Sequence, residues 1–237
     1  PDNPFIDQAV SFNVDGVQIA SANIVRLGQI DLANIQVLKG PQALFFGKNS
    51  PGGVIAIRTA DPGDSFEVTG TVDYEFNARE VSGLLTVSGP LNETLKGRLA
   101  LYVNKMSGYF KNKSPTIPGV TQAPSDRRAP NSKEFYGRAT LLFEPSDIFT
   151  ARLKYSYDHL NSSDAFSIYQ RIACPQGSPQ VAPYPQSVAV DDCKADNITY
   201  NGDPLDSLVE PFSSVFKDTG SRSRQHLASL EMNLEVA

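Results

Sequence analysis

Apolar and polar residues alternate from residue 66 onward, and this pattern restricts the chain to strands with two unlike faces. Between residues 66 and 76 every second residue is apolar or glycine, and the residues between them are Glu, Thr and Asp. Because successive side chains of a β-strand point to opposite faces, one face of this strand is apolar and the other is polar. The same pattern returns at residues 81–87, 95–104, 135–143, 149–158 and 229–236. The sequence therefore predicts a mainly β fold with about six antiparallel strands.

The predicted strands are joined alternately by short and long connections. Residues 89–94 and 144–147 form short turns, whereas the segments at about 107–133 and about 160–222 are long. Outer-membrane barrels have tight periplasmic turns, long extracellular loops and aromatic residues near the strand ends. A soluble sandwich gives no reason for this alternation. One connection departs from it: the connection at residues 77–79 is short at a position where a barrel would allow a long loop. The pattern favours a barrel wall.

The sequence holds no apolar run that approaches the roughly 20 residues of a membrane-spanning helix. Contact with a membrane would therefore require a barrel or a surface association. A mean hydropathy of -0.26 fits a wall with a polar inner face and long, wet loops. A barrel that encloses a folded domain needs about 22 strands, so we expect these strands to be part of an incomplete wall.

Composition excludes several classes of function. The formal charge of -5 argues against nucleic acid as a partner, because no basic stripe is present. Cys174 and Cys193 would pair as a disulfide in an oxidising compartment. A zinc site is the weaker alternative, because His159 and His226 are not at ligand spacing. No catalytic constellation can be assembled from two histidines, so we predict no enzymatic activity, no metal centre and no cofactor.

The loop of residues 160–222 is rich in acidic residues. They indicate either a solvated loop or an outer loop that faces a ligand or a cation. The solvated loop is the simpler interpretation, since Asp191-Asp192 lacks the spaced oxygens of a calcium loop.

Residues 31–59 have the order of a strand, a tight turn, a short helical turn, a Gly-rich loop and a second strand. Apolar residues at 35–38 and 54–57 predict two buried strands, and Pro41 suits the start of a helical turn at residues 43–46. Upstream, Asp15-Gly16 predicts a hairpin turn between two short strands. Residues 20–29 are expected to form a surface loop, and residues 61–65 a linker.

Three strings of this region follow one another in a fixed order: Val37-Leu38-Lys39-Gly40-Pro41-Gln42, Phe46-Gly47-Lys48-Asn49-Ser50 and Gly52-Gly53-Val54-Ile55-Ala56-Ile57. Together with Val14-Asp15-Gly16-Val17, they resemble the plug signatures of TonB-dependent outer-membrane receptors. The resemblance implies that residues 1–62 are the C-terminal part of an α+β plug domain. Residues 63–237 would then be the N-terminal part of a 22-stranded transmembrane β-barrel. We therefore expect the chain to be a fragment that begins inside the plug.

The resemblance implies active uptake of a large solute through the outer membrane of a Gram-negative bacterium. The solute of such receptors is most often an iron-siderophore complex, and cobalamin or an oligosaccharide is the alternative within this reading. TonB would act through a segment that precedes residue 1, and outer-membrane lipid would surround the wall. The competing class is a β-rich surface protein, such as an adhesin or a signalling receptor, that carries out no transport.

Carried over residue by residue, the resemblance gives candidate contacts with the solute at Phe46, Gln42 and Arg26. Phe46 stands where the family often has Tyr, so it would offer an aromatic wall without a hydroxyl. Lys39 and Arg58 would pair with acids on the inner wall of the barrel. Asn34 and Gln36 stand where the family often has charged residues, which would replace part of that ionic contact with neutral amides.

Overall fold

The computed structural model describes residues 10–19, 30–42, 50–114, 116, 118–119, 121–122, 127–163, 172, 193–200, 203–204 and 220–236. These residues contain fifteen strands, β1 to β15, and no helix. No helix within these ranges is long and apolar enough to cross a membrane. The expected helical turn at residues 43–46 and the expected loop at residues 20–29 lie outside the described residues.

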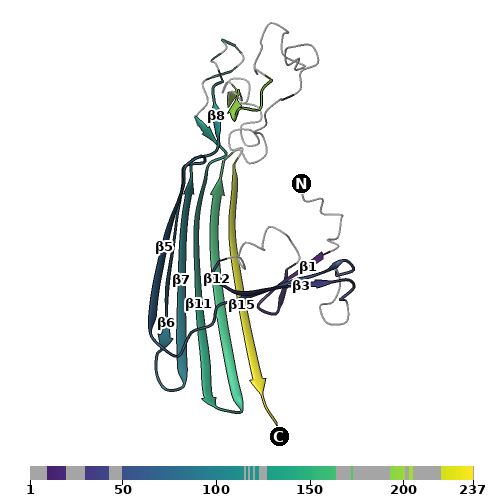
Figure 1. Ribbon diagram of the computed structural model, residues 1–237, viewed down its shortest axis with the longest axis vertical. Coiled ribbons are helices and arrows are strands. Elements are labelled where there is room, and N and C mark those ends of the chain that lie inside the picture. The colour runs from purple at the N-terminus through teal and green to yellow at the C-terminus, as the bar shows by residue number, and fades with distance from the viewer. Residues whose placement is uncertain are drawn as a thin grey trace.

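Six long strands form the large sheet (Figure 1). They are β5 (Glu67–Glu75), β6 (Glu80–Pro90), β7 (Leu95–Met106), β11 (Ser132–Ser146), β12 (Phe149–Ser162) and β15 (Ser221–Leu234). Their order is β15-β12-β11-β7-β6-β5, and every neighbouring pair is antiparallel. The prediction of six antiparallel strands is confirmed. The last strand, however, begins at Ser221 and not near residue 229. Residues 221–226 are all polar, so no alternation of apolar and polar residues indicates that they pair with β12.

The two faces of the large sheet are reversed relative to a sheet in water. Along β11 the side chains of Glu134, Tyr136, Arg138, Thr140 and Leu142 are buried, and those of the residues between them are mostly exposed. Phe135, Leu141 and Phe143 are examples from this exposed apolar face. The period-two alternation is therefore confirmed, and the buried face is the polar one. Such a wall fits lipid on its outside and a polar domain on its inside.

Four short strands form the small sheet, which runs crosswise to the long strands on one face of the large sheet (Figure 1). They are β1 (Val10–Val14), β2 (Val17–Ile19), β3 (Leu32–Lys39) and β4 (Gly53–Thr59), in the order β2-β1-β4-β3. The pair β1–β4 is parallel, and the other pairs are antiparallel. Val14, Ile19 and Ile57 form its core, against which Leu227 of β15 packs.

The predicted hairpin turn between β1 and β2 is confirmed. Asp15 has a φ of 48° and Gly16 a φ of 83°, as a two-residue type I′ turn requires. The prediction that both strands of residues 31–59 are buried is wrong for β3, since Ile35 is 53% exposed and Val37 is 62% exposed. The reason is its place in the sheet: β3 is an edge strand that pairs only with β4.

The described parts of the two long connections lie together at one end of the large sheet, above the strands in the view of Figure 1. They run between Met106 and Ser132 and between Ser162 and Ser221, slightly shorter than the expected 107–133 and 160–222. They are also not plain loops. β8 (Phe110–Asn112) pairs with β10 (Arg128–Ala129) and with β13 (Ile198–Thr199) of the other connection. β9 (Thr121–Gln122) and β14 (Asp203–Pro204) form a second link between the two connections.

Candidate functional site: the interface between the two sheets

Lys154 of β12 projects from the polar face of the large sheet into the small sheet, and its side chain is only 3% exposed. Its Nζ donates hydrogen bonds to Thr59 O at 3.0 Å, Thr59 Oγ1 at 2.9 Å and Asp15 Oδ1 at 3.2 Å. Asp61 Oδ1 is an ion-pair partner at 2.8 Å. All of these oxygens belong to the small sheet or to the residues that follow it. One buried ammonium therefore holds the turn β1–β2 and the end of β4 against the wall.

Asp15 occupies its position because the tight turn presents its carboxylate to the end of β4. Thr59 N donates to Oδ1 at 3.0 Å, Thr59 Oγ1 donates to Oδ2 at 2.7 Å, and Asp15 N donates to Ile57 O at 3.0 Å. Burial acts to raise the pKa of Asp15, but the hydrogen bonds from Thr59 and the charge of Lys154 outweigh it, so the pKa lies below 3.8. Asp15 is therefore ionised at neutral pH.

The contact continues as a row of alternating charges. Asp61 Oδ2 lies 3.0 Å from Arg152 Nη2, Arg152 Nη1 lies 2.6 Å from Glu231 Oε2, and Arg58 Nη2 lies 3.1 Å from the same oxygen. We call this row the interface ladder; its members, in order, are Asp15, Lys154, Asp61, Arg152, Glu231 and Arg58. Three members come from the large sheet, and three come from the small sheet and the segment after it. The side chains of Arg58 and Glu231 are 55% and 41% exposed. Loss of one partner should therefore cost more unfolding free energy at the buried end, at Lys154, than at this exposed end.

A second anchor lies at the start of β3. Arg98 of β7 donates from Nε to Asp31 Oδ2 at 2.9 Å and from Nη2 to Asp31 Oδ1 at 2.5 Å. The side chain of Asp31 is 6% exposed and that of Arg98 is 17% exposed. Beside them, Arg138 Nη1 donates to Ile30 O at 2.9 Å. Such a two-pronged arginine–carboxylate contact fixes orientation as well as distance. The small sheet is thus held to the wall at two separated points.

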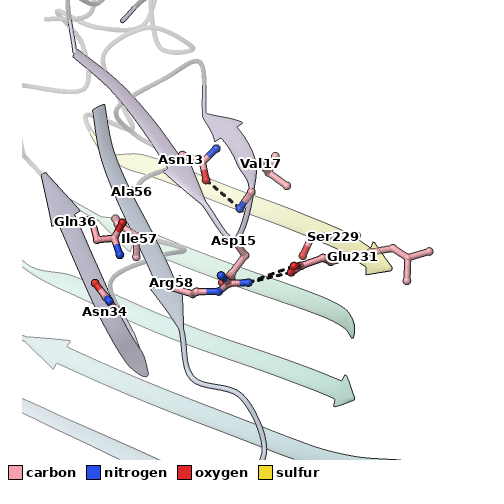
Figure 2. A pocket seen from close by; sticks show the side chains of 13 residues that line it. Asn13, Asp15, Val17, Asn34, Gln36, Ala56, Ile57, Arg58, Ser229 and Glu231 are labelled. Carbon is pink, nitrogen blue, oxygen red and sulfur yellow. Dashed lines mark hydrogen bonds and ion pairs between the residues drawn. The ribbon is translucent and has the colours of Figure 1, made fainter. Parts of the chain in front are cut away.

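Figure 2 shows a hollow between the small sheet and β15, with a volume of about 580 Å³. Its lining mixes polar and apolar residues, and the polar ones include Asn13, Asn34, Gln36, Arg58 and Glu231. Asn34 and Gln36, where charged residues of the family often stand, line this space with neutral amides. The interface therefore combines ion pairs with a gap of mixed polarity beside them.

The predicted site residues fall in different places. Arg58 lies in the interface ladder, where it contacts Glu231 of the wall. Lys39, at the end of β3, is exposed and forms no ion pair within the described part of the chain, so its wall contact stays a prediction. Gln42 N donates to Ser50 O at 3.2 Å, at the base of residues 43–49. Phe46 and Arg26 lie outside the described residues.

The predicted disulfide is only half within the described residues. Cys193 is disulfide-bonded, and Cys174 lies outside them. Cys193 begins the described segment of residues 193–200. This segment contains β13, which pairs with β8 of the other long connection.

Sequence reasoning missed most of the interface: Asp15, Asp31, Asp61, Arg98, Arg152 and Lys154. A signal was present, because the alternation places the three bases on the polar face of their strands. The three acids lie in or beside turns and ends of the small sheet. The alternation does not predict which acid pairs with which base.

Comparison with known proteins gives the following relationships. No family model matches the chain. The pesticin receptor of Yersinia pestis is 30% identical over 92 residues, which cover 38% of this chain and 13% of that receptor. The ferrioxamine B receptor of Salmonella typhimurium is 28% identical over 103 residues, which cover 40% of this chain and 14% of that receptor. The chain therefore spans about one seventh of the length of these relatives.

Among solved structures, FpvA of P. aeruginosa in complex with a heterologous iron pyoverdine matches 96% of this chain and 26% of its own. The TM-score is 0.60 and the sequence identity is 16%, so this match concerns the fold. It covers nearly all of the chain, the small sheet and the six-stranded wall together. In sequence the chain is therefore similar to part of these two receptors, and in fold it is similar to part of FpvA.

Proposed function

We propose that this chain is part of an active transporter that takes up a ferric siderophore through the outer membrane, driven by TonB. The observation that carries the proposal is the interface ladder, with Lys154 at its buried end. A folded sheet held to the polar side of a barrel wall obstructs the lumen. Passage of a large solute then requires displacement of this sheet, and hence a source of energy. In this proposal the chain has no enzymatic role.

The names of the relatives support the siderophore as the solute class. One curated relative is a receptor for ferrioxamine B, and the solved structure that covers nearly the whole chain holds an iron pyoverdine. Both are complexes of iron with an organic chelator. A ferric siderophore is therefore the first solute to test on the intact receptor.

Within this proposal Phe46, Gln42 and Arg26 contact the solute from the small-sheet side, and Lys39 contacts an acid of the wall. On either side of residues 43–49, Gly40 N donates to Gly52 O at 3.3 Å and Gln42 N donates to Ser50 O at 3.2 Å, so the chain enters and leaves this segment at neighbouring points. An aromatic side chain on such a segment provides a flat apolar surface for a ligand.

The test is uptake of radioactive iron by iron-starved cells that carry or lack the intact receptor. Ferrioxamine B and pyoverdine serve as iron carriers, and a strain without TonB serves as the energy control. We expect uptake of one of them only when both receptor and TonB are present. Normal surface exposure of the receptor without uptake of any ferric siderophore would contradict the proposal and favour an adhesin or signalling role.

Single variants locate the solute contact. Phe46→Ala is expected to weaken binding of the ferric siderophore to the purified receptor. The matched control is Phe66→Ala, since Phe66 is 74% exposed and lies just before β5, away from the base of residues 43–49. Equal affinity of both variants and the wild type would remove Phe46 from the proposed contact.

A further inference from the structure

The outward, apolar face of the large sheet carries charge at one end only. The alternation of side chains along each strand shows which residues lie on this face. Its bases are Lys105 of β7, Lys133 of β11, and Arg222 and Arg224 of β15. Within the bounds of the six strands no Asp or Glu occupies an outward position, since every acid there alternates onto the polar face. In a chain with a formal charge of -5, this face is purely basic.

The strand register aligns these bases in two neighbouring rows. Lys105 pairs with Lys133, and Lys133 lies opposite Asn161, which lies opposite Arg222. Arg224, one row below, lies opposite His159. All four bases are exposed. They lie at the end of the sheet from which the long connections emerge (Figure 1).

From the row of Arg224 downward, this face is otherwise mostly apolar and aromatic. Phe135 and Val103, 44% and 54% exposed, lie in the row of Arg224, and Tyr155, 46% exposed, lies two rows lower. Tyr157 and His226 contact each other there in a tilted arrangement, with ring centroids 5.0 Å apart. This sequence of levels, from apolar wall through aromatic residues to bases, is that of a surface passing from hydrocarbon to headgroups. Long basic side chains at this level extend their charges to the headgroups.

A hollow of about 420 Å³ lies at the base-rich end, lined by Lys105, Met106, Ser107, Arg128, Asn131, Ser132 and Lys133. No carboxylate lines it, and within the described residues the four bases form no ion pair. Arg128 is held in place by a hydrogen bond from Nε to Gly108 O at 2.8 Å and by another to Asn77 O. The hollow thus gathers three cations, and no acid of the described chain neutralises them.

We propose that Lys105, Lys133 and Arg128, extended by Arg222 and Arg224, bind the phosphate groups of a glycolipid in the outer leaflet of the membrane. Charge complementarity and continuity with the lipid-facing surface support this occupant. Phosphate oxygens accept several hydrogen bonds from guanidinium and ammonium groups at once. The site goes beyond the transport proposal, because Lys105, Lys133, Arg222 and Arg224 face away from the small sheet and from any solute in the lumen.

The test uses the intact receptor in detergent, with bisphosphorylated lipid A in mixed micelles as the probe. The variant Lys105→Gln/Lys133→Gln is compared with Lys111→Gln/Lys113→Gln. The control also removes two positive charges, one in β8 and one directly after it, in a long connection beyond the end of the large sheet. Two bases at a membrane surface are worth roughly thirtyfold in affinity, which is the loss expected for the first variant alone. Arg222→Gln/Arg224→Gln provides a second test pair in case the first fails to fold, as judged by heat-modifiable mobility.

Three outcomes would overturn the site. The first is equal affinity of the wild type for bisphosphorylated and fully dephosphorylated lipid A. The second is an equal loss in the test and control variants, which would indicate general charge attraction. The third is complete competition by inorganic phosphate at constant ionic strength, which would indicate a free-anion site. Solute binding is measured on the same variants and is expected to be unchanged, so that failure of this site and failure of the transport proposal remain distinguishable.

Discussion

Replacement of Lys154 by Met is predicted to loosen the small sheet from the wall without unfolding the barrel. Met keeps an unbranched side chain of similar length, so the change removes the charge and its hydrogen bonds and leaves little cavity. The carboxylates of Asp15 and Asp61 then lose the ammonium group that they share. The lysine side chain that supplies it is only 3% exposed. Buried charges without a partner are strongly unfavourable.

The magnitude follows from the contacts that remain. Removing one partner of a buried ion pair costs about 3–5 kcal/mol. Asp61 retains Arg152 at 3.0 Å, and Asp15 retains two hydrogen bonds from Thr59. We therefore expect a loss near the lower end, about 3 kcal/mol, or roughly a hundredfold rise in the local opening constant.

Hydrogen exchange of the intact receptor measures this opening directly. The amides of Asp15 and Thr59 are hydrogen-bonded within the small sheet, next to Lys154, so peptides that cover β1–β2 and β4 report on loss of this anchor. Lys96→Met is the matched control, because the two carboxylates that pair with this lysine, Asp64 and Glu144, are 89% and 35% exposed, and no change is expected in these peptides. Unchanged exchange of the β4 peptide in Lys154→Met, or an equal rise in both variants, would refute the central role of the ladder.

Three further predictions concern the same interface and are measured as the urea midpoint for unfolding of the small sheet in the intact receptor. Because the folded-state pKa of Asp15 is lowered below 3.8, its contribution is complete above about pH 4 and is lost only as the pH falls through that lowered value. The gap between wild type and Asp15→Asn should then stay constant down to about pH 4; a gap that closes at about pH 6 would contradict it. Asp31→Asn should destabilise by about 2–4 kcal/mol, since it leaves its arginine without a charged partner, whereas the exposed Asp64→Asn should change nothing measurable. Gly53→Ala should destabilise by at least about 1–3 kcal/mol, because φ is +143° and a Cβ would lie 2.5 Å from a β3 carbonyl oxygen; Gly70→Ala, with open space around it, should be tolerated.

Local patterns were sufficient for the elements and their faces. The alternation along β5 and β11 located both strands and assigned their apolar sides, because the side-chain period of a strand depends only on its own backbone. The turn at Asp15-Gly16 was equally local, since few residue pairs adopt two positive φ values. Where the local signal was absent, as in residues 221–228 of β15, the predicted strand was too short.

Pairings between distant segments could not be predicted in this way. The pairing of β8 with β13 joins two long connections, and neither segment has a sequence feature that predicts the other as its partner. The exposure of β3 depends on its edge position in a sheet order that apolar content does not encode. These features are decided when separately formed elements dock.

The sequence alone determined that this chain makes strands with a polar and an apolar side, that their connections alternate in length, and that its plug motifs resemble those of a receptor family. Only the tertiary structure decided which charges meet. Lys154 and Asp15 are 139 residues apart, and the alternation assigns Lys154 a face but no partner. The crosswise docking of the small sheet on the wall selects that partner, because an ion pair depends on the position of two side chains in space and a strand pattern reports only one of them.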